Sequence, residues 1–534
     1  MARFLSRLLV IVIAMVAAHV AFGQVIISSV SSTTVTRSGR VVISGSGFGL
    51  PGPSSDVLVG GLVAPHARWN DNLIVAYVPE ATPLGSNDIV VRIGSAFSPP
   101  ITITVVDRQP NGRVNWRFQA DAPYIFQRPS LAPDGTIIAH DAGGFVYSLA
   151  PNGGLNWIFH TRTFASGPPS VGTDGTVYVG NSTTVTALNP DGSLKWEFTS
   201  LDPRAIAAGP TVGPDGKIYV FFDPVTGVYA FNPDGTIAWT YSSTDLFDLF
   251  EYGAEFAFGP TVPGGPSDQV YLSFGESPSG FLWAWNMASG SLAFATPETQ
   301  TWDNFMQPQG QATTAPDGTI FTACSVDIGS STSVNAFNPD GTSKWRVTEF
   351  GGTSAPDLGP NGNVYFAFQL IHLGALDSSG HALWSVTDGV NSVQYPIANP
   401  AGGMVFAGGG TNGQPGFVRA YNAANGATLW EVGLPFENGG NQAMNSRPRF
   451  AADGQTVYFG TTIPTAASDT YSYLYAIDTS GTAVAATLTG LTLTPTTVDG
   501  GTSSLGQITL SAPAPAGGAV IALSSSSGSA QVPG

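Results

Sequence analysis

Short apolar runs that alternate with tight turns cover most of the chain after residue 24. A recurring unit opens with one run, a turn and a second run, as in PTVGPDGKIYVF (210–221). It continues with a third run, another turn and an aromatic residue, as in VYAFNPDGTIAW (228–239). The runs are rich in Val, Ile, Tyr and Phe, which favour strands, while Pro, Asp and Gly supply the geometry of tight turns. The pattern predicts an all-β protein built from short antiparallel strands.

Eight such units follow one another, and the aromatic residues that end them predict their arrangement. Trp157, Trp196, Trp239, Phe294, Trp345, Trp384 and Trp430 recur at intervals of 39 to 55 residues, the length of a four-stranded propeller blade. The eighth unit lacks its final aromatic residue, and a lone strand at 113–118 carries Trp116 with no strands of its own before it. We therefore predict an eight-bladed β-propeller over residues 108–486 in which this lone strand completes the last blade. Seven blades are the alternative if one unit is degenerate. The repeated tryptophans, Trp116 included, are predicted to be structural residues wedged between blades.

The turns within a unit predict which face of the propeller carries a binding site. Connections in an antiparallel sheet alternate between its two ends, so the first and third turns of each unit share one face, here called the tight-turn face. The long segments at 240–261, 294–314 and 433–450 fall on the opposite, long-loop face, where loops on a scaffold often bind partners. The candidate binding residues are aromatic residues, arginines and acids of this face: Arg204, Phe247, Asp248, Phe250, Glu251, Tyr252, Trp302, Asp303, Phe305 and Arg447. The alternative is that the aromatic residues pack the loops onto the propeller and that the acids form a solvated stretch.

The charge of the chain narrows the classes of partner. Charged residues make up 10% of the sequence, the net charge is −17, and the lysines are Lys195, Lys217 and Lys344. Nucleic-acid binding needs clustered cations, so nucleic acid is excluded as a partner, and no polybasic segment indicates a membrane surface. The six histidines show no metal-binding spacing, and no Gly-x-Ser-x-Gly motif occurs. The sequence therefore assigns no catalytic, cofactor-binding or metal-binding residue.

Residues 1–23 have the pattern of a secretory signal peptide. Arg3 and Arg7 precede an apolar run at 8–18, and residues 21–23 form a small-x-small cleavage site. The apolar run is shorter than a comfortable membrane span, and an uncleaved anchor is the alternative. We expect a secreted protein, extracellular or at the cell surface, with the periplasm as the alternative location and no membrane span after cleavage.

Two modules flank the predicted propeller. Residues 25–106 contain GSGFG after a strand, a VGG hairpin and a WNDNLI strand before a Val-Pro turn. This segment closely resembles the IPT/TIG immunoglobulin-like family. Residues 487–534 look like the start of a second Ig-like domain of bacterial surface proteins, although an Ig-like sandwich usually needs about 100 residues. We expect this last module to be partial.

The propeller repeats resemble the pyrroloquinoline-quinone (PQQ) family. The motif of that family is A-x-D-x-x-T-G-x-x-x-W, and Ala420 to Trp430 keep its spacing, with Asn422 and Asn425 in place of the Asp and the Thr. The resemblance implies the propeller fold and, for the dehydrogenases of the family, PQQ with calcium. Those enzymes typically carry a disulfide between adjacent cysteines, which the single cysteine of this chain, Cys324, cannot form.

The sequence thus favours a secreted, non-catalytic binding or scaffold protein that recognises a protein or a glycan through the long-loop face, without a cofactor. One alternative is a quinoprotein dehydrogenase that depends on PQQ and calcium. Another is a scaffold for outer-membrane assembly, which the added Ig-like modules disfavour. An acidic cluster converging on the centre of the propeller would favour the enzyme, whereas a filled or apolar centre would favour the binding protein.

Overall fold

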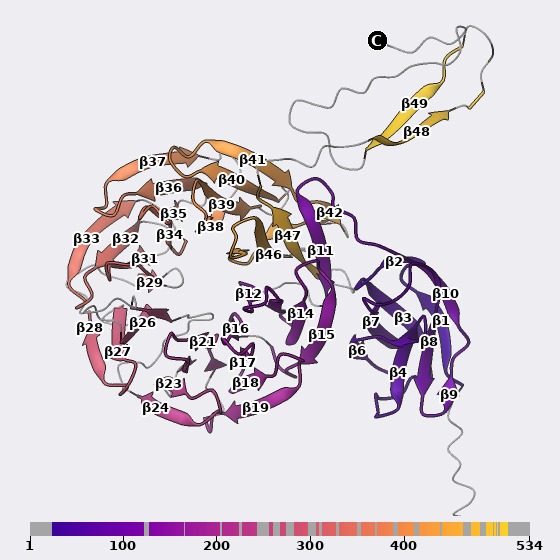
Figure 1. The fold of residues 1–534 in the computed structure, drawn as a ribbon, viewed down its shortest axis with the longest axis horizontal. Helices are drawn as coiled ribbons and strands as arrows, with labels where there is room; N and C mark the ends of the chain where they lie inside the picture. The colour runs from indigo at the N-terminus through magenta and orange to yellow at the C-terminus, as the bar shows by residue number, and fades with distance from the viewer. Residues whose placement is uncertain are drawn as a thin grey trace, which may run out of the picture. The chain divides into compact units, whose positions relative to one another are not determined.

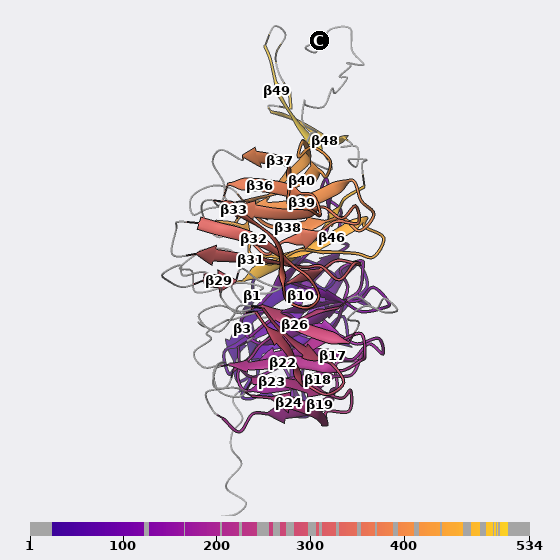
Figure 2. The same ribbon diagram turned by 90° about the vertical axis from the view of Figure 1, so that its left-hand side faces the viewer.

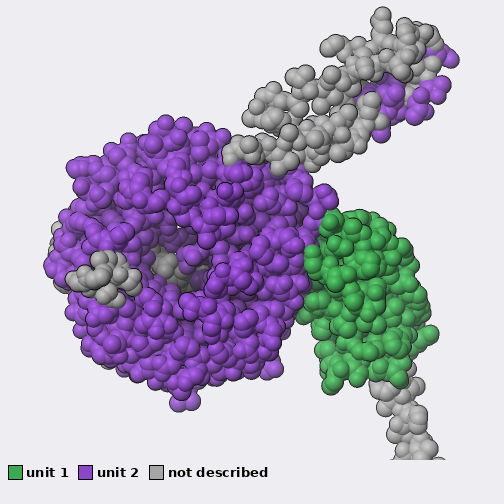
Figure 3. All heavy atoms as spheres, in the orientation of Figure 1, with its two compact units in different colours: residues 1–107 green, residues 108–534 purple. Residues whose placement is uncertain are grey.

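The computed structural model divides the chain into two compact units, residues 1–107 and 108–534, which Figure 3 shows in different colours. The described residues are 24–121, 128–164, 166–202, 206–223, 227–242, 256–259, 268–273, 282–296, 306–308, 312–326, 331–349, 354–368, 371–387, 393–410, 416–437, 440–462, 471–480, 488–494, 496–497, 499 and 502–510. The predicted signal peptide lies outside them. Within these ranges, no helix is long and apolar enough to cross a membrane.

Unit 1 is a sandwich of two sheets. The first sheet has the order β1 (Ile26–Val30), β3 (Arg40–Ser46), β7 (Leu73–Tyr77) and β6 (His66–Trp69). The second has the order β2 (Thr34–Thr36), β10 (Ile101–Val106), β8 (Gly85–Ile93), β4 (Ser55–Val59) and β5 (Leu62–Val63), and β9 (Ala96–Phe97) pairs with β8. Alternate apolar residues of both sheets, among them Val41, Ile43, Val57 and Val91, meet in one buried core. The observed architecture is the immunoglobulin-like sandwich that the sequence predicts.

The described strands of residues 108–480 form eight antiparallel sheets of four or five strands, numbered here as blades 1 to 8. Blade 1 contains β12 (Ser130–Leu131), β13 (Ile137–His140), β14 (Phe145–Leu149) and β15 (Leu155–His160). Blade 2 contains β16 (Ser170–Val171), β17 (Val177–Asn181), β18 (Thr184–Leu188) and β19 (Leu194–Thr199). Blade 3 contains β20 (Ile206–Ala207), β21 (Thr211–Val212), β22 (Ile218–Asp223), β23 (Gly227–Phe231) and β24 (Ile237–Tyr241). Blade 4 contains β25 (Ala257–Phe258), β26 (Gln269–Ser273), β27 (Leu282–Asn286) and β28 (Leu292–Ala295).

The second half of the ring follows the same plan. Blade 5 contains β29 (Met306–Pro308), β30 (Thr313–Thr314), β31 (Ile320–Val326), β32 (Ser331–Phe337) and β33 (Ser343–Glu349). Blade 6 contains β34 (Asp357–Leu358), β35 (Val364–Phe368), β36 (His372–Leu376) and β37 (Ala382–Thr387). Blade 7 contains β38 (Val393–Ala398), β39 (Met404–Gly409), β40 (Phe417–Asn422) and β41 (Thr428–Gly433). Blade 8 contains β44 (Ala443–Met444), β45 (Arg449–Phe450), β46 (Thr456–Thr462), β47 (Ser472–Asp478) and β11 (Val114–Ala120).

Two further pairs of strands complete the described elements, β42 (Phe436–Glu437) with β43 (Gly440–Asn441), and β48 (Leu488–Thr494) with β49 (Leu505–Leu510). The second pair belongs to the segment where the sequence suggests a partial Ig-like module, which stays a prediction.

The blades surround a common centre, with β12, β16, β21 and β29 on the inside and β15, β19, β24, β33 and β37 on the outside (Figure 1). The view turned by 90° shows this ring edge-on (Figure 2). The ring closes because β11 pairs with β47, so that Trp116 lies opposite Ala476. This pairing confirms that the lone strand completes the last blade. Closure removes the exposed sheet edges that a linear array would leave at both ends.

Burial changes from the middle of a blade to its rim. The middle strands β17 and β18 are buried almost throughout, because each of their faces packs against a neighbouring blade. The outer strand β19 alternates between exposed and partly buried positions, since it meets solvent on one side. Apolar residues on both faces of the middle strands therefore form the core between blades, and the all-β prediction is confirmed.

Candidate functional site

Each blade is joined to the next by the aromatic residue at its outer strand. In blade 2, the indole N–H of Trp196 donates to the carbonyl of Pro233 in blade 3 at 3.0 Å. The same bond joins Trp116 to Pro151, Trp157 to Pro190, Trp239 to Met287, Trp345 to Ser378 and Trp384 to Ala423, at 2.8–3.0 Å. At the seventh joint, the Arg113 guanidinium lies over the Trp430 ring, 4.6 Å from its centroid, and donates to the carbonyl of Ser480. The structure thus places all seven predicted structural tryptophans at blade joints.

The glycine of the third turn completes this joint. Gly235 has φ of 88°, and a Cβ at this position would lie 2.8 Å from Cδ2 of Trp196. Only glycine combines that backbone conformation with such close approach of an indole ring. The arrangement explains why a turn that contains glycine precedes the aromatic residue of each unit. The equivalent glycines with the same contact are Gly153, Gly192, Gly290, Gly341, Gly380 and Gly426.

First and third turns lie side by side, as the alternation of connections predicts. A Cβ at Gly135, in the first turn of blade 1, would lie 3.4 Å from Pro151 in its third turn, and one at Gly175 would lie 3.1 Å from Pro190. Lys195 on this face donates to Asp174 at 3.2 Å, and Lys344 donates to Asp317 at 3.3 Å. These two lysines of the tight-turn face are therefore bonded to the protein itself.

The sequence predicts ten candidate binding residues on the long-loop face. Nine of these ten candidates lie outside the described residues: Arg204, Phe247, Asp248, Phe250, Glu251, Tyr252, Trp302, Asp303 and Phe305. The described strands that flank these candidates, such as β24 and β25, fix the face on which the connections begin and end. Arg447 is described.

Arg447 lies at the inner edge of blade 8 and links three blades. Its guanidinium donates to Asp357 Oδ1 of blade 6 at 2.8 Å and to the carbonyl of Pro356 at 3.3 Å. The other carboxylate oxygen, Oδ2 of Asp357, accepts from the amide of Ala398 in blade 7 at 2.8 Å. The two side chains are 12% and 19% exposed, so the ion pair is only partly screened by water. The cation that we predicted to meet a ligand is thus bound within the ring.

Hydroxyl groups of Ser and Thr near the centre also form hydrogen bonds between neighbouring blades. Ser130 donates to the carbonyl of Pro169 at 2.5 Å, and Thr314 donates to that of Phe258 at 2.7 Å. Thr211 accepts from the amide of Phe256 at 3.2 Å. Each bond crosses from the inner strand of one blade to its neighbour. For Ser130 and Thr211, the signal in the sequence is the Ser or Thr that follows Pro at the start of a unit, which the sequence analysis did not use.

The sequence alone also did not reveal a buried acid on the long-loop side. Asp141, between β13 and β14, has no exposed surface, and burial raises its pKa to about 7. Tyr147 donates to Asp141 Oδ2 at 2.7 Å, and the Tyr147 hydroxyl accepts from the amide of Asp121 at 3.0 Å. Because Asp121 follows β11, this chain of bonds ties the closing strand of blade 8 to blade 1. A carboxyl group without exposed surface cannot reach a substrate, so Asp141 is a structural acid.

The family of the chain follows from comparison of its sequence. A family model described as "Outer membrane protein assembly factor BamB" matches residues 102–294 and 330–532, well over half of the chain. The chain belongs to this family. Residues 25–105 match the IPT/TIG domain, in agreement with the sandwich of unit 1.

Several solved structures are similar to part of this chain. The Dos1 propeller is 13% identical, with a TM-score of 0.50 over 68% of this chain and 95% of its own. BamB from Moraxella catarrhalis is 13% identical, with a TM-score of 0.49 over 68% of this chain and 99% of its own. Quinohemoprotein alcohol dehydrogenase from Comamonas testosteroni is 13% identical, with a TM-score of 0.49 over 70% and 77%. No curated protein matches the sequence.

The described residues near the centre do not form a calcium site of the kind that the resemblance to the dehydrogenases implies. In the part of the chain that the structure describes, no group of three or more His, Cys, Asp or Glu side chains could hold a metal ion. Asp357, at the centre, already accepts from Arg447 and Ala398. Its neighbour Thr313 donates to the carbonyl of Pro356 at 3.0 Å. The side-chain oxygen atoms of Asp357 and Thr313 are thus already bonded to groups of the protein.

Proposed function

We propose that this member of the BamB family is a non-catalytic scaffold that recognises a protein or a glycan through the long-loop face. The observation that carries the proposal is the match of most of the propeller to a family described as an assembly factor. Assembly requires a rigid surface that presents loops to a partner, rather than a reactive group.

The distribution of ionisable groups supports a binding role. Arg447 is paired with Asp357, and Asp141 is enclosed by Tyr147 and backbone amides, so these groups maintain the ring. A rigid ring can hold long connecting segments at fixed spacing, which favours multivalent contact with an extended partner.

The predicted signal peptide supports a place of action outside the cytoplasm. We propose export, with either the periplasm or the cell surface as the final location. Nucleic acid is not expected to be a partner. Lys195, Lys217 and Lys344 each form an ion pair with an aspartate of a first turn, so their charges are already compensated within the protein.

The proposal is tested by removing the aromatic candidates together. The probes are a glycan array and synthetic peptides with alternating apolar and polar residues, the pattern of outer-membrane strands. We expect the variant with Phe247, Phe250, Trp302 and Phe305 changed to Ala to bind at least tenfold more weakly than the natural protein, since buried aromatic residues dominate binding energy. The matched control changes four exposed aliphatic residues of the outer strands to Ser and should bind normally: Leu194, Ile237, Leu383 and Leu429, which are 46–53% exposed.

Equal loss of binding in both variants, or in neither, would contradict the assignment to the long-loop face. A separate calorimetric titration with PQQ and Ca²⁺ tests the non-catalytic role. Saturable binding of one quinone per chain would overturn that role and favour the dehydrogenase.

A further inference from the structure

Seven of the eight blades share one row of paired residues at the tight-turn end. In blade 2, Tyr178 of β17 lies opposite Ala187 of β18, which lies opposite Trp196 of β19. The rings of Tyr178 and Trp196 are 5.9 Å apart. The other blades repeat the row as Tyr219–Ala230–Trp239, Tyr271–Ala284–Phe294, Phe321–Ala336–Trp345, Tyr365–Ala375–Trp384, Phe406–Ala420–Trp430 and Tyr458–Ala476–Trp116.

Blade 1 departs from this row at two positions together. Its row is Ile138–Ser148–Trp157, with an aliphatic residue in place of the ring and a hydroxyl group in place of the alanine methyl. Both Ile138 and Ser148 are 1% exposed. A branched aliphatic side chain does not extend as far as a phenol ring, so the space that the ring fills in the other blades is left open here.

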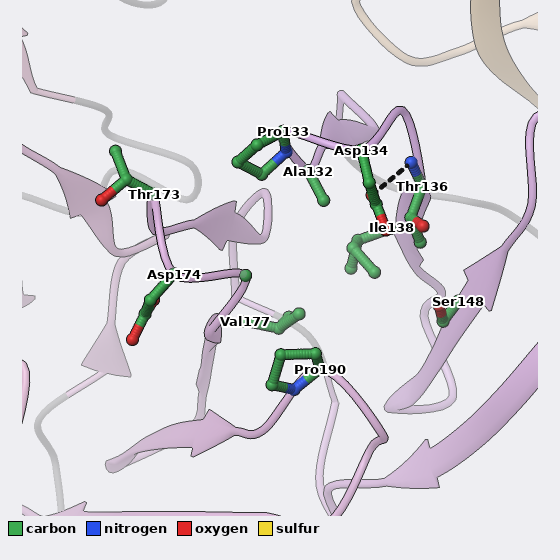
Figure 4. Close-up of a pocket in the computed structure, with 11 residues that line it drawn as sticks. Ala132, Pro133, Asp134, Thr136, Ile138, Ser148, Thr173, Asp174, Val177 and Pro190 are labelled. Atoms are coloured by element: carbon green, nitrogen blue, oxygen red, sulfur yellow. Dashed lines mark hydrogen bonds between the residues drawn. The ribbon is translucent and has the colours of Figure 1, made fainter.

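A cavity of about 300 Å³ lies at this place, between blades 1 and 2. Asp134, Ile138 and Ser148 line it from blade 1, and Val177 and Pro190 line it from blade 2 (Figure 4). An apolar cavity of ~150 Å³ already admits benzene, and ligand pockets begin at about 300 Å³. The cavity thus has room for a substituted aromatic ring.

The tyrosines of blades 3 and 6 make a polar contact that blade 1 lacks. In blade 3, the hydroxyl of Tyr219 donates to Asp215 Oδ2, in the first turn of its own blade, at 2.9 Å. In blade 6, the hydroxyl of Tyr365 is bonded to Asn361 at the equivalent turn position. The corresponding residue of blade 1 is Asp134, whose Oδ1 accepts from the amide of Thr136 at 2.9 Å. Hydrogen bonds from Thr136 lower the pKa of Asp134, so the carboxylate is charged at neutral pH and accepts strongly.

The geometry points to a binding site for a phenol, an aromatic ring whose hydroxyl donates to Asp134 while its faces pack against Ile138, Val177 and Pro190. Such a ligand would replace the ring and the hydrogen bond that blade 1 lacks. Ser148 accepts from Asn156 at 3.2 Å and can direct its own proton toward the ligand. The phenol is either a free small molecule or a tyrosine side chain of a partner protein. The site is on the tight-turn face and does not depend on the function proposed for the long-loop face.

The site is tested on the full chain by calorimetry and ligand-observed NMR with two matched pairs of probes. The first pair is 4-methylphenol and toluene, and the second is N-acetyl-tyrosinamide and N-acetyl-phenylalaninamide. We expect 4-methylphenol to bind at least fivefold more tightly than toluene, because only the phenol donates to Asp134. Tighter binding of the tyrosine amide than of the phenylalanine amide assigns the site to a partner side chain, and binding of 4-methylphenol alone assigns it to a free phenol.

Two variants test whether the phenol binds in this cavity or elsewhere on the protein surface. Ile138→Tyr restores the ring of the other blades, so it should abolish phenol binding and raise the thermal midpoint. Blade 8 carries Ala451 and Tyr458 together, which indicates that the ring is compatible with Ala132 at the equivalent turn. Asp134→Asn leaves the core untouched and should remove the preference for phenol over toluene, whereas Asp191→Asn, on an exposed turn, should leave it unchanged. Undetectable 4-methylphenol binding, or full binding by a folded Ile138→Tyr protein, would overturn the proposal.

Discussion

The joint between Trp196 and Gly235 predicts the cost of a single added methyl group. Gly235→Ala places a Cβ 2.8 Å from Cδ2 of Trp196 in a residue with φ of 88°. Gly216, in the first turn of the same blade, has φ of 78°, but a Cβ there meets no atom within 4 Å. The two alanine variants therefore share the cost of the left-handed conformation and differ in the collision with the indole ring.

The shared cost is about 1–2 kcal/mol for a non-glycine residue in this conformation. The displaced indole loses its hydrogen bond to Pro233, about 1 kcal/mol, and packing worth about a further 1 kcal/mol. We expect Gly216→Ala to lower the free energy of unfolding by about 1–2 kcal/mol, and Gly235→Ala by about 3–4 kcal/mol.

The assay is urea unfolding of the full chain, with each variant repeated in a Trp196→Ala background. Without the indole ring the collision disappears, so Gly235→Ala should then cost no more than Gly216→Ala, which is a double-mutant test of contact. Equal costs for the two glycines in the natural background, or an unchanged cost of Gly235→Ala in the Trp196→Ala background, would refute the reasoning.

Three further predictions concern other joints and buried charges. Phe294→Trp supplies the N–H that six other joints use, and thermal unfolding should show a gain of about 0.5–1.5 kcal/mol. Arg447→Ala leaves the Asp357 carboxylate without its cation, so urea unfolding should show a loss of about 1–3 kcal/mol that Asp357→Asn in the same chain partly reverses. The Asp141 carboxyl, with its pKa raised from 3.8 to about 7, contributes stability below pH 4 that is lost as the pH rises to 7. Burial lowers the pKa of His140 to about 3, so its contribution is present above pH 6.5 and is lost as the pH falls. The two slopes oppose each other, and Asp141→Asn should therefore make the unfolding midpoint fall more steeply below pH 6.5 than in the natural protein.

The local chemistry of the repeats is sufficient to predict the fold. Strand positions follow from short apolar runs between turn residues, and the position of Trp116 on a lone strand indicates how the ring closes. These features can be predicted from the sequence because each depends on residues within one unit and on the spacing between units. The sandwich of unit 1 is predicted in a different way, from the resemblance of residues 25–106 to the IPT/TIG family.

The roles of charged residues depend on contacts that sequence spacing does not reveal. From the sequence, Arg447 is predicted to be an exposed cation on a long segment. Its partner Asp357 is 90 residues earlier in the chain, so the sequence does not reveal their ion pair. Asp141 reads as a turn residue in a glycine-rich stretch, and it is buried because Tyr147 covers it where the ring closes against β11. Only the closed ring brings these groups together, so an assignment from exposure alone fails for Arg447.

In a repeat protein, each position of one blade can be compared with the equivalent position of the other blades. Residues that differ from the repeat can have different effects on the packing and on the hydrogen bonds of their blade. Phe294 replaces an indole but keeps the contact with Gly341, so that joint lacks the hydrogen-bond donor of the others. Ile138 and Ser148 alter two of the three positions of a paired row and leave a cavity beside a charged carboxylate. A substitution that only weakens a joint can accumulate by chance, because selection removes only substitutions that lower the stability below the level that function needs. A pair of changes that creates room and leaves an acceptor facing it is better explained by a ligand, which is why blade 1 is the place on the tight-turn face where binding is to be sought.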